Sequence, residues 1–181
     1  MSSIFLLFAL VLVLAAAGSI ILVTLRLGIP PMPSSMAIRS AVVQAVRREQ
    51  PVDTMTDLGS GWGGLARTLA RQFPESSVVG VEHSPFPLLF SVILNRLDTL
   101  ANLRFRRQRI ERYRLRSEQL YVCYLARDAM AALRRRIEHQ VPRDITLVSC
   151  HFAMPGWTPS RVLYAADVYR TPIYVYRRPC P

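Results

Sequence analysis

Three glycines, Gly59, Gly61 and Gly63, alternate with other residues in the stretch DLGSGWGGL at 57–65. An apolar run precedes them and a helix-like pattern follows, which predicts a turn between a strand and a helix. In a doubly wound α/β sheet this turn lies where ligands bind, and glycines there allow a tight bend and a close approach of the ligand to the backbone. The stretch therefore predicts a ligand-binding loop.

Two carboxylates accompany the glycines and indicate the kind of ligand. Glu82 ends the next strand-like segment, SVVGVE at 77–82, where a carboxylate can accept hydrogen bonds from both hydroxyls of a ribose. Asp57 leads the glycines, and its charge would repel a phosphate but favours a ligand that carries an ammonium group. S-adenosylmethionine has an ammonium, a sulfonium and a ribose, and no phosphate. Charge complementarity therefore favours it over a dinucleotide.

Strand-like and helix-like segments alternate along the chain, which predicts an α/β fold with a doubly wound, mostly parallel sheet. After a helix over 36–49, the predicted strands are 54–58, 77–82, 103–110, 120–125 and 145–152, and the predicted helices are 65–73, 85–100 and 128–139. The last two segments, 162–169 and 173–177, predict a closing antiparallel pair.

The N-terminus carries an uncharged apolar run, Ile4–Leu25, that ends at Arg26. A helix over this run would be roughly 33 Å long, close to the hydrocarbon thickness of a bilayer. A cleavable signal peptide is the alternative, because Ala15–Ala17 is rich in small residues, but Met1–Ser3 supplies no basic region and the apolar run continues past the alanines. The sequence therefore predicts one transmembrane helix before the α/β fold.

Arginines follow this run and none precedes it, so the positive-inside rule places the rest of the chain in the cytoplasm. The protein is therefore predicted to be a single-pass protein of a bacterial-type inner membrane. The predicted boundaries are 1–29 for the anchor and juxtamembrane stretch, 30–50 for a proline-rich linker and the first helix, and 51–181 for the main domain.

The formal net charge is +11, and every basic residue is arginine. The absence of lysine excludes lysine nucleophiles and Schiff bases. Seven arginines fall in Arg104–Arg116, which indicates either a solvated rim or a contact with anionic lipid headgroups or an acidic substrate. The cysteines, Cys123, Cys150 and Cys180, show neither a metal spacing nor a disulfide framework, so no metal site is predicted.

The stretch DLGSGWG at 57–63, followed by VGVE at 79–82, resembles motif I and its acidic partner in class I S-adenosylmethionine-dependent methyltransferases. A narrower resemblance covers most of residues 30–178. PMPS at 31–34 and FAMPGW at 152–157 are similar to the membrane-associated ATP synthase c-subunit lysine N-methyltransferase family and its bacterial relatives. The resemblance implies a Rossmann-like seven-strand methyltransferase sheet with a C-terminal antiparallel hairpin, and S-adenosyl-L-methionine as the cofactor.

By this resemblance, the glycines would line the methionine and ribose of the cofactor, Asp57 would hold the methionine amino group, and Glu82 the ribose hydroxyls. The full set of predicted cofactor-binding residues is Asp57, Gly59, Ser60, Gly61, Gly63, Glu82 and His83. The family places an acid for the adenine amino group after the third strand, whereas this chain has Arg107-Gln108-Arg109-Ile110 there. Adenine binding would then use Gln108, Glu111 or backbone groups.

Four further residues are candidates for the methyl-acceptor side. Tyr124 and His151, near the ends of the fourth and fifth strands, are the predicted catalytic residues. Phe152 and Trp157 are predicted to line the channel for an aliphatic lysine stem, and a packing role is the alternative for all four. Methyl transfer from a sulfonium needs alignment and a dry site, and a lysine amine can be neutralised by desolvation, so no catalytic base is obligatory.

The predicted function is methyl transfer from S-adenosylmethionine by a membrane-tethered enzyme, most specifically protein lysine N-methylation of an acceptor at or near the membrane. The alternatives are methylation of a small molecule or lipid, and a non-catalytic methyltransferase-like binding domain. RNA methylation is disfavoured because the chain has no N-P-P-Y motif and no cysteine at the place of a pyrimidine-C5 nucleophile. No nucleic-acid partner is therefore predicted.

Overall fold

The computed structural model describes residues 4–8, 10, 11, 14, 18, 34–49, 52–117, 119–140 and 144–178. The chain forms two compact units, Met1–Met32 and Pro33–Pro181. Within the described residues, no helix is both long enough and apolar enough to cross a membrane. Most of the predicted anchor over 4–25 lies outside the described residues, so the transmembrane helix stays a prediction.

The second unit is built on a seven-stranded sheet in the order β3-β2-β1-β4-β5-β7-β6. The strands are β1 (Thr54–Leu58), β2 (Ser77–Glu82), β3 (Leu103–Arg107), β4 (Gln119–Cys123), β5 (Ile145–Cys150), β6 (Arg161–Tyr164) and β7 (Pro172–Arg178). The first five run parallel, whereas β7 is antiparallel to both β5 and β6. The predicted doubly wound sheet with a closing hairpin is confirmed.

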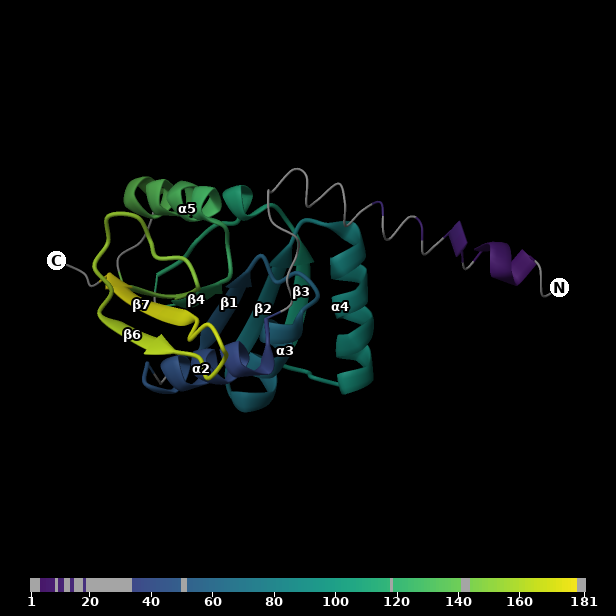
Figure 1. Cartoon of the computed structure of the whole chain (residues 1–181), viewed down its shortest axis with the longest axis horizontal. Coiled ribbons are helices and arrows are strands. Elements are labelled where there is room, and N and C mark those ends of the chain that lie inside the picture. The colour runs from purple at the N-terminus through teal and green to yellow at the C-terminus, as the bar shows by residue number, and fades with distance from the viewer. Residues whose placement is uncertain are drawn as a thin grey trace. The chain divides into compact units, whose positions relative to one another are not determined.

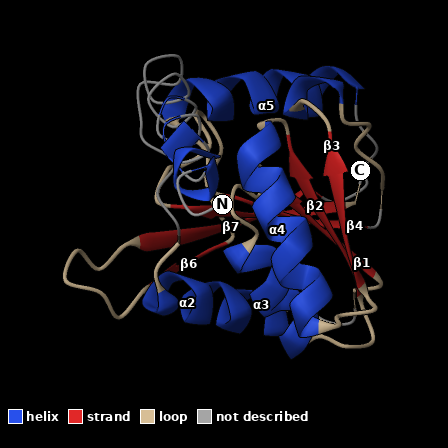
Figure 2. Ribbon diagram, turned by 90° about the vertical axis from the view of Figure 1, so that its right-hand side faces the viewer, coloured by secondary structure: helices blue, strands red, loops and turns tan. Residues whose placement is uncertain are grey.

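Four helices and a short 3₁₀ turn pack on this sheet. They are α2 (Met36–Arg47), α3 (Gly64–Gln72), α4 (Pro85–Asp98), η1 (Ile110–Arg112) and α5 (Arg127–Gln140). α2 and α3 lie on one side of the sheet and α5 on the other (Figure 1). α4 packs on β2 and β3 and faces the viewer in Figure 2.

Five strands, β1, β2, β4, β5 and β7, contribute to two hydrophobic clusters because their side chains alternate between the faces of the sheet. Met55, Val78 and Leu120 belong to the cluster beneath α2 and α3. Leu58 and Val81 belong to the cluster beneath α5. Both clusters lie entirely within the second unit, which therefore has its own core.

The boundaries of five strands differ from the predicted ones; β4 covers Gln119–Cys123 rather than 120–125, and β7 covers Pro172–Arg178 rather than 173–177. β3 ends at Arg107 rather than at 110, because the chain then bends into η1. β5 ends at Cys150 rather than at 152, since His151 adopts a left-handed backbone with φ of 70°. β6 ends at Tyr164 rather than at 169, because Asp167 organises a turn by accepting hydrogen bonds from Thr171.

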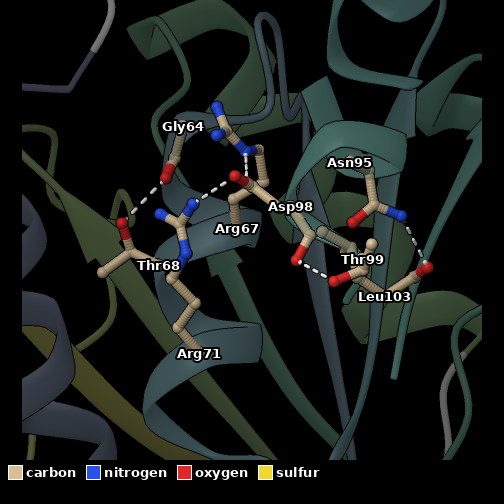
Figure 3. A network of polar contacts seen from close by, with 8 residues as sticks. All are labelled: Gly64, Arg67, Thr68, Arg71, Asn95, Asp98, Thr99 and Leu103. Carbon is tan, nitrogen blue, oxygen red and sulfur yellow. Dashed lines mark hydrogen bonds and ion pairs between the residues drawn. The ribbon is translucent and has the colours of Figure 1, made fainter. Parts of the chain in front are cut away.

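Ion pairs and hydrogen bonds join the helices to one another and to the sheet. Asp98 of α4 binds both Arg67 and Arg71 of α3 (Figure 3). Asn95 of α4 donates to the Leu103 carbonyl of β3 at 3.2 Å. These contacts hold α3 and α4 in a defined position behind the loop that joins β1 to α3.

Candidate functional site

The glycine loop follows β1 and is fastened to the neighbouring strand. The backbone N–H groups of Gly59 and Ser60 both donate to the carbonyl of Val81, at 2.9 and 3.0 Å. Gly59, Gly61 and Gly63 have φ values of +80°, +52° and +75°, which side-chain-bearing residues rarely adopt. The loop therefore needs glycine at all three places for conformational reasons.

The space around the three glycines differs. A Cβ on Gly61 would meet no atom within 4 Å. A Cβ on Gly59 would lie 2.9 Å from a Leu125 methyl, and one on Gly63 would lie 2.6 Å from the Ser91 Cβ. Gly61 therefore borders open space, whereas Gly63 permits close packing of the loop against α4.

The Glu82 carboxylate lies beside the open part of the loop. Its Oε2 accepts a hydrogen bond from the Gly61 N–H at 2.9 Å, and its Oε1 accepts one from the Ser84 N–H at 2.7 Å. Each carboxylate oxygen keeps a further lone pair for a ligand hydroxyl. His83, which follows Glu82, is exposed to solvent.

Asp57 is buried at the end of β1, with 2% of its surface exposed. Burial raises the pKa of its carboxyl to about 7, and the nearby charge of Glu82 also raises it, whereas a hydrogen bond from the Ala66 backbone lowers it. Oδ2 of Asp57 and Oγ of Ser60 are buried without a hydrogen-bond partner among the described residues.

Such orphaned polar atoms are rare in folded proteins, and next to an open glycine they are suited to hydrogen-bond donors of a ligand. An ammonium and hydroxyls, the groups that S-adenosylmethionine carries, fit this acceptor set.

Three aromatic side chains meet at the same edge of the sheet. Tyr124 directly follows β4, and its ring centroid lies 6.3 Å from that of His151, which directly follows β5. The His151 and Phe152 rings contact edge to face at 4.5 Å. Burial raises the pKa of Tyr124 above its ordinary value. The structure thus brings together three of the four residues predicted for the acceptor side.

Trp157 makes its contacts with other elements. Its indole N–H donates to Glu138 of α5 at 3.1 Å, and its ring lies 6.1 Å from that of Tyr176 in β7. These contacts give Trp157 a packing role between α5 and β7, which was the alternative reading for this residue.

Sequence reasoning missed two apolar neighbours of the glycine loop. Side chains of Leu125, just after β4, and Ile110, in η1, are those that a Cβ on Gly59 would meet. Ile110 stands close to the place where a family member would carry its adenine-binding acid. The side-chain amide of Gln108 donates to the Arg112 carbonyl at 3.0 Å, and Glu111 is exposed. The only available signal was the apolar character of Ile110 and Leu125 at the ends of strand-like segments.

A cavity of about 380 Å³ lies on the side of the sheet that carries η1. It is lined by Thr54, Ser77, Val79, Arg106, Gln108, Arg112, Tyr113, Arg114, Arg116 and Gln119. Gln108, one of the alternatives predicted for adenine binding, lines it, but none of the other predicted cofactor or acceptor residues does. The orphaned acceptors and the glycine loop lie instead at the carboxyl edge of the sheet, which is therefore the candidate cofactor site.

The fold matches solved methyltransferases. An RNA methyltransferase from Salinibacter ruber, solved with S-adenosyl-L-homocysteine, superposes with a TM-score of 0.70 at 20% identity, over 83% of this chain and 95% of that one. A putative methyltransferase from Escherichia coli, yhhF, gives a TM-score of 0.65 at 12% identity, over 84% and 90% of the two chains. At these identities the likeness concerns the fold.

The sequence comparison identifies the family. The ANTKMT methyltransferase domain matches residues 57–161, which span the glycine loop, Glu82, Tyr124 and His151. No curated protein matches the sequence of this chain. The match confirms the resemblance to class I methyltransferases drawn from the residues at 57–63 and 79–82. The chain therefore belongs to the ANTKMT methyltransferase domain family and is a methyltransferase that uses S-adenosylmethionine.

Proposed function

We propose that this enzyme methylates a lysine side chain of a protein at or near a membrane. The match of residues 57–161 to the ANTKMT methyltransferase domain carries this proposal, because it agrees with the resemblance to a lysine N-methyltransferase family. The aromatic rim of Tyr124, His151 and Phe152 supports it, since such a rim suits the aliphatic stem of lysine.

On the cofactor side, we assign each polar group of the loop a partner in S-adenosylmethionine. Oδ2 of Asp57 accepts from the amino group, and Ser60 provides a second buried polar contact. Glu82 accepts from the ribose hydroxyls while Gly61 and Ser84 hold its carboxylate in place. Gly61 leaves the space that the ligand fills. The cofactor supplies a methyl group activated by a sulfonium.

On the acceptor side, the chain's residues orient the amine and keep water away. The rings of Tyr124, His151 and Phe152 form a partly apolar rim that favours the neutral form of a lysine amine, because desolvation lowers the pKa of an amine. The imidazole of His151 is exposed at this rim and can take up the proton that the amine loses. Alignment and desolvation then provide most of the rate enhancement.

We further propose that the apolar run at 4–25 anchors the enzyme and that the methyltransferase domain lies on the cytoplasmic side. The uncharged character of this run and the arginines that follow it support the proposal. An anchored enzyme would meet acceptors that are confined to the same membrane.

The test uses the full chain in inverted membrane vesicles with S-adenosylmethionine labelled on the methyl group. We expect label in a protein band, and methyl-lysine after acid hydrolysis of that band. A Gly61→Val variant serves as the control that cannot bind cofactor. Label in the lipid extract, in small molecules or in nuclease-sensitive material would overturn lysine methylation. Absence of transfer from a folded, cofactor-binding enzyme to any component would favour the non-catalytic alternative.

A further inference from the structure

Helix α4 turns its apolar side away from the domain. The large apolar residues of α4 with more than a third of their surface exposed are Phe86, Leu89, Phe90, Ile93 and Leu97. Their spacing places them on one stripe of the helix. The buried residues of the helix are Pro87 and Ser91. A helix of a soluble domain normally buries its apolar stripe, so this arrangement is reversed.

The glycine loop extends this stripe toward the cofactor site. The Trp62 ring contacts the Phe90 ring edge to face, with centroids 5.4 Å apart. The stripe begins at Phe86, soon after Glu82. We call Trp62 and the five exposed residues of α4 the α4 face. It therefore starts at the edge of the sheet where the cofactor loop lies.

Two exposed arginines border the α4 face. α4 packs on the edge strand β3, to which Asn95 is hydrogen-bonded. Arg107 of that strand and Arg96 of α4 are exposed, whereas Arg104 and Arg106 alternate with Leu103 and Phe105 and so lie on the other face of the sheet, where Arg106 lines the cavity. Figure 2 shows α4 and β3 side by side at the surface of the domain. Apolar and aromatic side chains beside exposed arginines are typical of helices that lie in the interface of an anionic bilayer.

We propose that the α4 face inserts into the interfacial layer of an anionic membrane, with Arg96 and Arg107 at the headgroups. Charge complementarity favours an anionic membrane as the partner of the α4 face, because the chain carries a net charge of +11. Its basic residues are arginines rather than lysines, and arginine pairs well with phosphate. The contact belongs to the methyltransferase domain and is independent of the apolar run at 4–25. It places the mouth of the cofactor site at the membrane surface.

Trp62 and Trp157 allow a direct test, since they are the two tryptophans of the chain. Two full-length single-tryptophan variants are prepared, Trp157→Phe, which keeps Trp62, and Trp62→Phe, which keeps Trp157 between α5 and β7. Each is added to phosphatidylglycerol-containing vesicles whose acyl chains are brominated near the headgroup. We expect bromine to quench Trp62 at least threefold more strongly than Trp157.

Two substitution variants sharpen the test in the chain that keeps Trp62. Leu89→Glu with Ile93→Glu places charges on the α4 face at exposed positions, and we expect it to lower the quenching of Trp62 to that of Trp157. Val168→Glu is the matched control, because Val168 is 96% exposed in the turn between β6 and β7. We expect it to leave the quenching unchanged, and circular dichroism checks that all variants fold.

Equal quenching of the two tryptophans would overturn the proposal. If the α4 face instead joined two copies of the chain, the protein would be a dimer in detergent, and the variant with Leu89→Glu and Ile93→Glu would be a monomer. Brominated lipid would then not quench Trp62. If residues 1–29 covered it, their deletion would increase the quenching of Trp62 by iodide. Since the readout is contact with lipid, it is separate from the test for lysine methylation.

Discussion

At the residue scale, Asp57 combines an ionisable group with almost complete burial. A carboxyl so placed tends to stay protonated unless a ligand supplies a positive charge. Its pKa of about 7 in the folded protein lies above the ordinary value of 3.8. Burial of Asp57 therefore costs stability in the protein without cofactor, as expected of a residue that we propose to bind the amino group of the cofactor.

We predict a dependence of stability on pH that Asp57→Asn removes. Below pH 3.8 the carboxyl is protonated in both folded and unfolded chains. As the pH rises toward 7, the unfolded chain loses this proton first, so the free energy of unfolding falls, by on the order of 2–4 kcal/mol. Without cofactor, Asp57→Asn should thus be more stable than the wild type at pH 8 and similar at pH 4.

Thermal unfolding of both proteins, without cofactor, at a series of pH values checks this prediction. The wild type should lose melting temperature relative to Asp57→Asn between about pH 4 and pH 7. A constant difference across this range would show that the Asp57 carboxyl is already ionised in the folded protein.

The glycines give a second prediction at this scale, because Gly61 and Gly63 share a left-handed backbone but differ in their surroundings. Gly61→Val should keep the fold, with a backbone strain of about 1–2 kcal/mol, and should lose cofactor binding. Gly63→Val should in addition clash with Ser91 and Phe105, whose atoms would lie 2.6 and 2.7 Å from a Cβ. Its free energy of unfolding should therefore fall by roughly a further 1–3 kcal/mol, and it should unfold at a clearly lower temperature.

Circular dichroism and calorimetric titration with S-adenosylmethionine separate the two variants. Retained cofactor affinity in Gly61→Val would mean that the open space beside Gly61 is not the ligand site. Equal melting temperatures for both variants would contradict the packing role of Gly63.

At the element scale, α3 and α4 form a pair next to the glycine loop, which leads into α3 and packs through Gly63 on Ser91 of α4. Asp98 is the centre of this pair, since it binds two arginines of α3 and its side chain is 16% exposed (Figure 3). The hydrogen bond from Arg67 and the charges of Arg67 and Arg71 hold the pKa of the Asp98 carboxyl below its ordinary value. The ion pairs therefore stabilise the fold at neutral pH.

We predict that Asp98→Asn lowers the free energy of unfolding by about 1–2 kcal/mol at pH 7, because two partly buried guanidinium groups lose their charged partner. The carboxyl is protonated in both states well below pH 3.8, so the difference from the wild type should shrink as the pH falls through that range. Urea unfolding at pH 7 and pH 3 measures both effects. A difference that persists at low pH would assign the loss to packing rather than to charge.

At the scale of the whole molecule, the question is why an apolar segment precedes a domain with its own core. If the acceptor lies in the membrane, an anchor confines enzyme and acceptor to one thin layer and raises their effective concentration. The core clusters of the described residues lie within the unit Pro33–Pro181, so removal of residues 1–29 should leave the domain folded.

We predict that deletion of residues 1–29 leaves the affinity for S-adenosylmethionine unchanged and reduces methylation of the native membrane acceptor at least tenfold. A soluble peptide copied from that acceptor should be methylated equally by both forms. Initial rates on vesicles and on the peptide provide the comparison. If the shortened enzyme methylated native membranes as fast as the full chain, the apolar run would not act by bringing enzyme and acceptor together.

Local patterns in the sequence were sufficient to predict the order of the elements, the glycine loop, the acid at Glu82 and the closing hairpin. These features depend on neighbouring residues, because strand periodicity, glycine at left-handed positions and a carboxylate at a strand end are each encoded within a few residues.

The tertiary structure decided which of these residues share a site. The sequence predicted the same role for Gly61 and Gly63. In the structure, Ser91 and Phe105 from distant elements fill the space beside Gly63, whereas the space beside Gly61 stays open. Sequence likewise grouped Phe152 with Trp157, whereas Trp157 is held by Glu138 of α5. The sequence predicted a helix over 85–100 but not which side of it is exposed, because only contacts between segments far apart in the chain determine which side of a helix is buried.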